Sequence, residues 1–149
     1  MAVHQIIEIP DPRLRTISKP VAEVTDDIRQ LLDDMLATMY DAPGIGLAAP
    51  QVGVTKRIIV VDVTKKDNER QPYQMINPEI TWSSEELLDY EEGCLSLPDQ
   101  YAQVTRPEKI QLTYMNRDGK TKKIEANGIL ATCIQHEMDH LEGILFVDH

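Results

Sequence analysis

Two histidines near the end of the chain have the spacing of a metal-binding helix, in the segment His136-Glu137-Met138-Asp139-His140. Residues four apart lie one above the other on one helix face, so both imidazoles can point at one ion. The glutamate after the first histidine points to a neighbouring sector, where it can take a proton from water and pass it to a leaving amine. The segment therefore predicts a metal-dependent amide hydrolase with His136 and His140 as ligands and Glu137 as general acid/base. Because the flanking positions are apolar, a surface helix with two incidental histidines is the weaker interpretation.

A catalytic ion of this type needs a third protein ligand and an open position for water. The pattern HExxHxxGxxH would place a histidine where Phe146 stands, and the chain ends before a glutamate further downstream could serve. Cys133 shares the helix face, but at about 1.5 Å rise per residue it lies roughly 10 Å from the level of His140, whereas a metal–sulfur bond is about 2.3 Å. The remaining candidate is Cys94, in EGCLSLP, a segment that glycine and proline mark as irregular and able to approach the helix from outside.

The hydrophobic pattern predicts the helices that must position these residues. Residues 129–141 form a predicted helix with apolar side chains on two neighbouring faces, so that nearly all of its circumference should be covered. A second, amphipathic helix should begin at Thr25 and end near Pro43-Gly44, with its Met and Leu stripe packed in the core. A short helical turn is predicted at Asp11-Pro12.

Short β-branched segments predict strands, and their succession along the chain implies antiparallel pairing. The segment GIGLAAPQVG (44–53) is expected to be a loop, because it is too rich in glycine and proline for a helix or a central strand. Residues 64–71 are expected to be a solvated loop, and NRDG (116–119) predicts a hairpin turn. The fold class is therefore α+β, with mostly antiparallel strands around one buried metal-binding helix. The predicted strands cover residues 57–63, 73–76, 80–83, 101–106, 109–115 and 120–126.

Length and composition limit the class of protein. The chain has 149 residues and is 42% hydrophobic, which suits a single catalytic domain over residues 1–149. A formal net charge of -10 disfavours direct binding of nucleic acid. No apolar stretch is long enough to span a membrane and the first residues do not resemble a signal peptide, so we expect a cytoplasmic protein with no membrane partner. Its two cysteines are expected to be free thiols or metal ligands in a reducing compartment.

Three segments occur together in this chain: GIGLAAPQ at 44–51, EGCLS at 92–96 and QHEMDH at 135–140. In this order they resemble the bacterial peptide deformylases, the enzymes that remove the N-formyl group from N-formylmethionine at the start of nascent polypeptides. The resemblance extends over essentially the whole chain. HExxH alone would be only moderately specific, whereas the three motifs together are a strong match.

The resemblance implies metal and proton-transfer roles that agree with the spacing argument. Cys94 would join His136 and His140 as the third ligand, and Glu137 would be the general acid/base. Thiolate and imidazole ligands are compatible with Zn²⁺ or Fe²⁺. The family implies Fe²⁺ as the native ion, with Zn²⁺, Ni²⁺ or Co²⁺ able to substitute.

The remaining implied roles concern the substrate. The side-chain amide of Gln51 and the backbone N–H of Leu95 would stabilise the oxyanion that forms when water attacks the formyl carbon, before formate is released. Glycines in GIGLAAPQ would let the backbone approach a peptide closely, which a Cβ would block. The methionine side chain would lie in an apolar pocket, with Tyr90 as a further candidate for its wall. The residues implied in substrate binding are Ile45, Gly46, Gly93, Ile129 and Cys133.

The implied partners are nascent peptides that begin with N-formylmethionine, and we expect a monomer. Bacterial members of the family usually continue into a C-terminal helix that helps docking on the ribosome, whereas this chain stops at Val147-Asp148-His149. We therefore expect catalysis to be retained and docking on the ribosome to be weakened. Three alternatives stay open at this stage: a metallopeptidase that cleaves internal amide bonds, a module with a structural metal, and a paralogue that binds formyl-Met ends without hydrolysing them.

Overall fold

The computed structural model describes residues 2–64 and 69–148, and in this part of the chain the strands form two antiparallel sheets. The larger sheet has the order β1-β2-β3-β6-β7, and β4 and β5 form a two-stranded sheet. Mostly antiparallel strands combined with two helices confirm the predicted α+β fold class. The strands are β1 (Gly46–Ala48), β2 (Ile58–Val61), β3 (Tyr73–Ser83), β4 (Leu87–Cys94), β5 (Leu97–Pro107), β6 (Lys109–Met115) and β7 (Thr121–Asn127).

The helices begin and end close to the predicted positions. Helix α1 (Asp26–Asp41) is capped by Thr25, whose hydroxyl accepts a hydrogen bond from the backbone N–H of Ile28, and α2 spans Gly128–Leu141. No helix in the described residues is long and apolar enough to cross a membrane. The residues that the structure describes also contain three short 3-10 helices: η1 (Pro12–Arg15), η2 (Ala49–Val52) and η3 (Phe146–Asp148).

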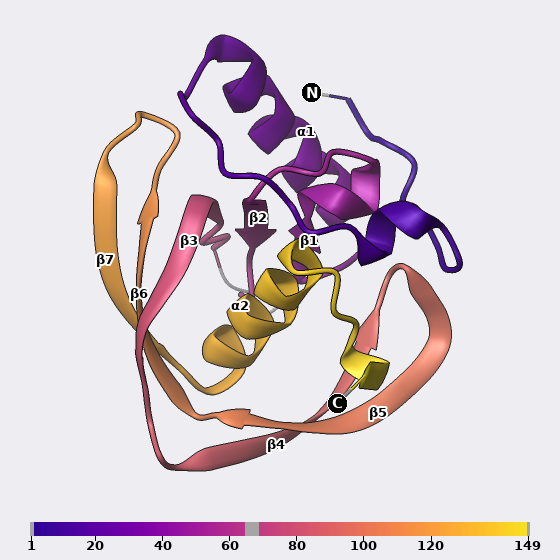
Figure 1. Ribbon diagram of the computed structural model, residues 1–149, viewed down its shortest axis with the longest axis vertical. Helices are drawn as coiled ribbons and strands as arrows, with labels where there is room; N and C mark the ends of the chain where they lie inside the picture. Colours follow the sequence, from indigo (N-terminus) through magenta and orange to yellow (C-terminus); the bar gives the residue numbers. More distant parts are fainter. Residues whose placement is uncertain (1, 65–68, 149) are drawn as a thin grey trace.

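The five-stranded sheet lies between the two helices, and the side chains of β2 pack toward both of them. Alternate side chains of a strand point to opposite faces. Ile58 and Val60 pack in the cluster that contains the apolar side of α1, whereas Ile59 and Val61 pack in the cluster that contains α2. Figure 1 shows α2 in the middle of the molecule, with β3, β6 and β7 curving past it on one side and the β4–β5 hairpin on another. The predicted buried helix is therefore present, although Ile129 in its first turn is 43% exposed and was wrongly expected to be covered.

Two predictions about the sheet were wrong. The segment 44–53 is not a loop throughout, because it contains the edge strand β1 and the 3-10 helix η2. The predicted strands 73–76 and 80–83 are one strand, β3, with a register shift at the Asn77-Pro78 step, where Asn77 has φ 51°. Proline cannot donate to the ladder, so it interrupts the pairing without ending the strand. The hairpin turn at 116–119 is confirmed between β6 and β7, whereas the predicted loop 64–71 lies partly outside the described residues.

The segment that carries Cys94 was wrongly expected to be irregular. Cys94 is the last residue of β4, immediately before a tight turn into β5. Alternate side chains of β4, including Tyr90, Glu92 and Cys94, are the less exposed ones, as expected for a strand with one face turned inward. Sequence patterning misses this strand because a charged residue, Glu92, occupies its most buried position.

Candidate active site

The structure brings Cys94, His136 and His140 together. One ligand atom from each lies within 4.8 Å of the others, and Cys94 Sγ is 3.3 Å from His140 Nε2. Both imidazoles come from one face of α2, and the thiol comes from the end of β4, 46 residues earlier than His140. The three groups converge from two elements that are separate in the sequence, as a shared ion would require.

The orientation of His136 is set by a carboxylate behind it. Its Nδ1 lies 2.8 Å from Oε1 of the buried Glu92, which leaves Nε2 available for another partner. A metal-binding histidine commonly donates its other ring nitrogen in this way. Phe146, at the position where a third histidine was excluded, stacks on the His136 ring at a centroid distance of 5.9 Å. It therefore contributes packing to the site rather than a ligand atom.

The donor set and its charges fit a transition-metal cation. Burial alone would lower the pKa of His136, but the nearby Glu137 carboxylate and hydrogen bonds to Cys94 and Glu92 raise this pKa to about 10. Burial and the neighbouring His136 lower the pKa of His140 to about 3. His140 is therefore neutral near pH 7, which is the form that can bind a metal ion. Two imidazoles and one thiol are ligands that suit Zn²⁺ and Fe²⁺.

Glu137 lies beside this cluster and is almost fully buried, with 5% of its surface exposed. Its Oε1 is 4.0 Å from His140 Nε2 and has no hydrogen-bond partner within the described part of the chain. Burial raises the pKa of the Glu137 carboxyl to about 7. A group that ionises near neutral pH can both accept and return a proton, which is what a general acid/base must do.

Because Gly46 has no Cβ, its backbone lies closer to Glu137 than the backbone of any other residue type could. A Cβ added there would lie 2.4 Å from Glu137 Oε2 and 2.8 Å from Cys133 Sγ. We expect Gly46→Ala to displace the carboxyl and to lower kcat roughly 10- to 100-fold without loss of the metal, as steady-state kinetics and metal analysis would measure. Gly119→Ala is the control, because its Cβ would lie 3.9 Å from Val24 in the turn between β6 and β7, outside the lining of both active-site cavities, and kcat should change by less than about threefold. Equal losses in both variants would contradict the proposed close approach.

Gln51 is held with its amide nitrogen toward the cluster. Its Oε1 accepts a hydrogen bond from the backbone N–H of Ala48, and its Nε2 lies 3.1 Å from Ser96 Oγ and 3.5 Å from Cys94 Sγ. Leu95 occupies the turn directly after Cys94, so both residues predicted to stabilise an oxyanion lie next to the thiol. Ser96, a fully buried hydroxyl that orients Gln51, was not predicted from the sequence.

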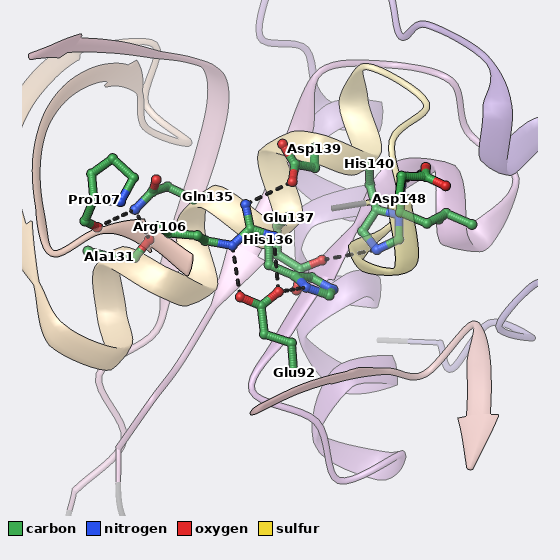
Figure 2. A network of polar contacts seen from close by, with 11 residues as sticks. Glu92, Arg106, Pro107, Ala131, Gln135, His136, Glu137, Asp139, His140 and Asp148 are labelled. Carbon is green, nitrogen blue, oxygen red and sulfur yellow. Dashed lines mark hydrogen bonds and ion pairs between the residues drawn. The ribbon is translucent and has the colours of Figure 1, made fainter. Parts of the chain in front are cut away.

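A network of buried polar groups behind the histidines was also missed (Figure 2). Arg106 of β5 donates to both carboxylate oxygens of Glu92 and to Asp139 of α2. Gln135, four residues before Asp139, donates to the backbone carbonyl of Pro107. The sequence did contain a signal for this network. Gln135 and Asp139 lie four residues apart on a helix with little exposed surface, so they share a face on which both need polar partners.

Two adjoining cavities open beside Glu137. The larger, of about 400 Å³, runs along the cluster between the segment 43–46 and the start of β5, and Gly46 and Gly93 lie on its walls. The smaller, of about 120 Å³, extends toward the first turns of α2 and includes Tyr90. The predicted substrate-binding residues in the wall of the smaller cavity are Ile45, Gly93, Ile129 and Cys133.

Fold and site together define a metal-dependent hydrolase of the HExxH type, built on an α+β scaffold with a thiol beside the two histidines. The sequence model of the family described as polypeptide deformylase matches residues 3–149. The chain therefore belongs to the peptide deformylase family, whose enzymes remove the N-formyl group from N-formylmethionine.

Similar proteins agree with this assignment. The peptide deformylase of Rhizobium meliloti (strain 1021) is 58% identical over 149 residues, covering 100% of this chain and 86% of the relative. A crystal structure of a probable peptide deformylase from Synechococcus phage S-SSM7 is 49% identical with a TM-score of 0.92, covering 97% of this chain and 98% of that one. The peptide deformylase of Ehrlichia chaffeensis, crystallised with actinonin, is 43% identical with a TM-score of 0.94, covering 99% of this chain and 88% of that one.

Proposed function

We propose that this chain removes the formyl group from nascent peptides with one metal ion bound by Cys94, His136 and His140. The observation that carries the proposal is the convergence of these three ligand atoms within 4.8 Å beside a buried glutamate. When bound, the ion acts as a Lewis acid toward water and the formyl oxygen. We propose Fe²⁺ as the native ion, with Zn²⁺, Ni²⁺ or Co²⁺ as substitutes, because a mixed thiolate and imidazole set accepts each of them.

We assign proton transfer to Glu137. A pKa of about 7 lets its carboxylate take the proton from the attacking water and return it to the methionine nitrogen as the C–N bond breaks. Hydrolysis then yields formate and a free amino terminus. The buried position of the carboxyl keeps bulk water from competing for the proton.

We assign stabilisation of the oxyanion to the Gln51 amide and the Leu95 backbone N–H. The bond from Ala48 N–H to Gln51 Oε1 fixes which end of the amide faces the cluster, so a donor is already oriented before the substrate arrives. The smaller cavity is the proposed site of the methionine side chain. Its walls include the apolar Ile45, Ile129 and Cys133.

Gln51→Ala should lower kcat about a hundredfold while KM for a formyl-Met peptide changes little, because the lost hydrogen bond forms mainly in the transition state. Gln111→Ala is a suitable control, since Gln111 lies in β6 and pairs with Glu125 away from both cavities. The measurement is steady-state formate release at several peptide concentrations. A Gln51→Ala enzyme with unchanged kcat would show that this amide does not bind the oxyanion.

The function is tested by comparing two peptides with iron-loaded protein handled without oxygen. Formate should be released from a formyl-Met peptide, and an unformylated peptide with a blocked N-terminus should stay intact. Internal cleavage of the second peptide without formate release from the first would favour a metallopeptidase instead. Binding of the formyl-Met peptide without turnover would favour a paralogue that only recognises such ends.

We further propose that residues 1–149 act as one catalytic domain and as a monomer. The family match over residues 3–149 supports the first, and a site drawn from one chain, from Gly46 to His140, supports the second. Because its substrates are nascent peptides, we place the enzyme in the cytoplasm near the ribosome. We propose that direct docking on the ribosome is weak, which co-sedimentation with ribosomes would test.

A further inference from the structure

The metal ligands sit on two parts of the fold that share few apolar contacts. His136 and His140 belong to α2, which packs in the core of the five-stranded sheet. Cys94 belongs to the β4–β5 hairpin, which forms a sheet of its own. The hairpin packs on the rest of the chain in a small apolar cluster of Leu97, Val104, Leu145 and Phe146, with Ala102 and Cys94 at its edge. Its turn is held by Leu95, which packs against the apolar cluster of α1, and by hydrogen bonds of Ser96 with Ile9 and Gln51. These contacts hold the turn of the hairpin, and a further set of bonds joins its strands to α2.

Arg106 connects the two parts through a set of bonds that we call the Arg106 bridge. Its Nε and Nη2 donate to Glu92 at 2.8 and 3.0 Å, and its Nη1 donates to Asp139 at 2.8 Å. Glu92 lies two residues before Cys94 on the same face of β4, and Asp139 directly precedes His140 on α2. The planar guanidinium therefore joins a neighbour of one ligand to a neighbour of another.

The geometry of the bridge constrains both ligands at once. Arg106 and Glu92 are 5% and 6% exposed, so their bonds do not exchange freely with water. The same Glu92 oxygen that accepts from Arg106 Nη2 lies 2.8 Å from His136 Nδ1 (Figure 2). A shift of the hairpin relative to α2 would break the bonds that cross between them, from Arg106 Nη1 to Asp139 and between Glu92 and His136, while the Glu92–Arg106 pair would move with the hairpin.

We propose that Arg106 is a positioning residue that, together with Asp139, holds the Cys94 hairpin against α2 and thereby sets how tightly the metal is retained. This inference rests on the proposed metal site. It predicts that loosening the bridge lowers the contribution of the Cys94 thiolate to metal affinity more than the contribution of the histidines, because the histidines keep their place on α2. Loss of such supporting bonds typically costs about 10- to 100-fold in metal affinity.

The test uses Co²⁺ binding to metal-free full-length protein, read from the visible d–d bands and the thiolate-to-cobalt charge-transfer band. Asp139→Asn removes the negative charge from one arm of the bridge, which leaves at most a weaker neutral hydrogen bond there, and it keeps the Glu92–Arg106 pair in place, so it should fold. Arg106→Lys replaces the planar fork by a single ammonium group. Each should raise the Kd for Co²⁺ about 10- to 100-fold, speed transfer of Co²⁺ to a chelator, and weaken the charge-transfer band relative to the d–d bands.

Arg117→Gln is the matched control, because it removes another Arg–Asp bridge, to Asp33 of α1, away from the metal ligands. It should leave the Kd for Co²⁺ and the spectrum within about twofold of the unmodified protein. The double variant Asp139→Asn/Arg106→Lys should bind no more weakly than Arg106→Lys alone, since both changes act through one bridge.

The possible results distinguish a failure of the proposed metal site from a failure of the Arg106 bridge. An unmodified protein whose Co²⁺ spectrum lacks the thiolate band would overturn the proposed metal site and the bridge with it. A normal spectrum in the unmodified protein, with unchanged Kd and band intensities in both bridge variants, would overturn the bridge alone. So would a fall in melting temperature of the metal-free variants without any change in Co²⁺ binding, since that result would mean a purely structural role.

Discussion

Replacing Glu137 by glutamine should lower kcat for formate release about 10²- to 10⁴-fold while the metal content stays the same. Glutamine has nearly the same size and shape as glutamate but cannot exchange a proton near neutral pH. The loss should therefore fall on kcat rather than on KM, because substrate binding does not need the carboxylate. Stopped assays of formate at saturating peptide, together with metal analysis of each sample, would measure both quantities.

Glu142→Gln is the natural comparison for this variant. Glu142 follows the last residue of α2 and pairs with Arg57 at the surface, so the same chemical change occurs at the end of the same helix. Its kcat should stay within about twofold of the unmodified enzyme. If Glu137→Gln kept the turnover of this control, proton transfer would have to be assigned to another group.

Replacing Cys94 by alanine should remove most of the bound metal and, with it, activity. Zinc binding by four protein ligands is worth about 10–16 kcal/mol, so one ligand contributes about 3 kcal/mol, or roughly a hundredfold in affinity. The activity loss should be larger, about 10³-fold, because the remaining ion would also lack its fixed position relative to Glu137. Metal content by elemental analysis and kcat/KM on the same preparation are the two measurements.

The second cysteine supplies the control for this prediction. Cys133 is buried on the same face of α2 as the histidines, and its Sγ lies 3.5 Å from the Ile45 carbonyl oxygen. Burial raises the pKa of the Cys133 thiol well above its usual value, so it remains protonated and is a poor ligand. Cys133→Ser should therefore keep its full metal content. A Cys94→Ala protein that retained both metal and turnover would show that the third ligand lies elsewhere.

Features that depend on neighbouring residues were predictable from the sequence. The position of His136 relative to His140 was predictable, since residues four apart must share a face in any regular α-helix. The same holds for the cap at Thr25 and the turn at 116–119, which depend on residues that are adjacent in the chain. The motifs also indicated the family, because three short segments occur in their expected order.

Contacts between distant segments were harder to predict. Cys94 was chosen as a candidate by elimination and by resemblance, but its strand was missed because charged residues replace the apolar alternation of a typical strand. The charge of Glu92 is tolerated in the interior only because Arg106 and His136 lie against it. No local pattern identifies those partners.

The residues alone were enough to predict the fold class, the two helices, the pair of histidines on one helix face and the family. The folded chain was needed to establish the strand β4, the contact between Cys94 Sγ and His140 Nε2, and the Arg106 bridge. The physical reason is that helices and turns are stabilised by residues near one another in the chain. The distance between a strand and a helix depends instead on register and packing across the whole fold.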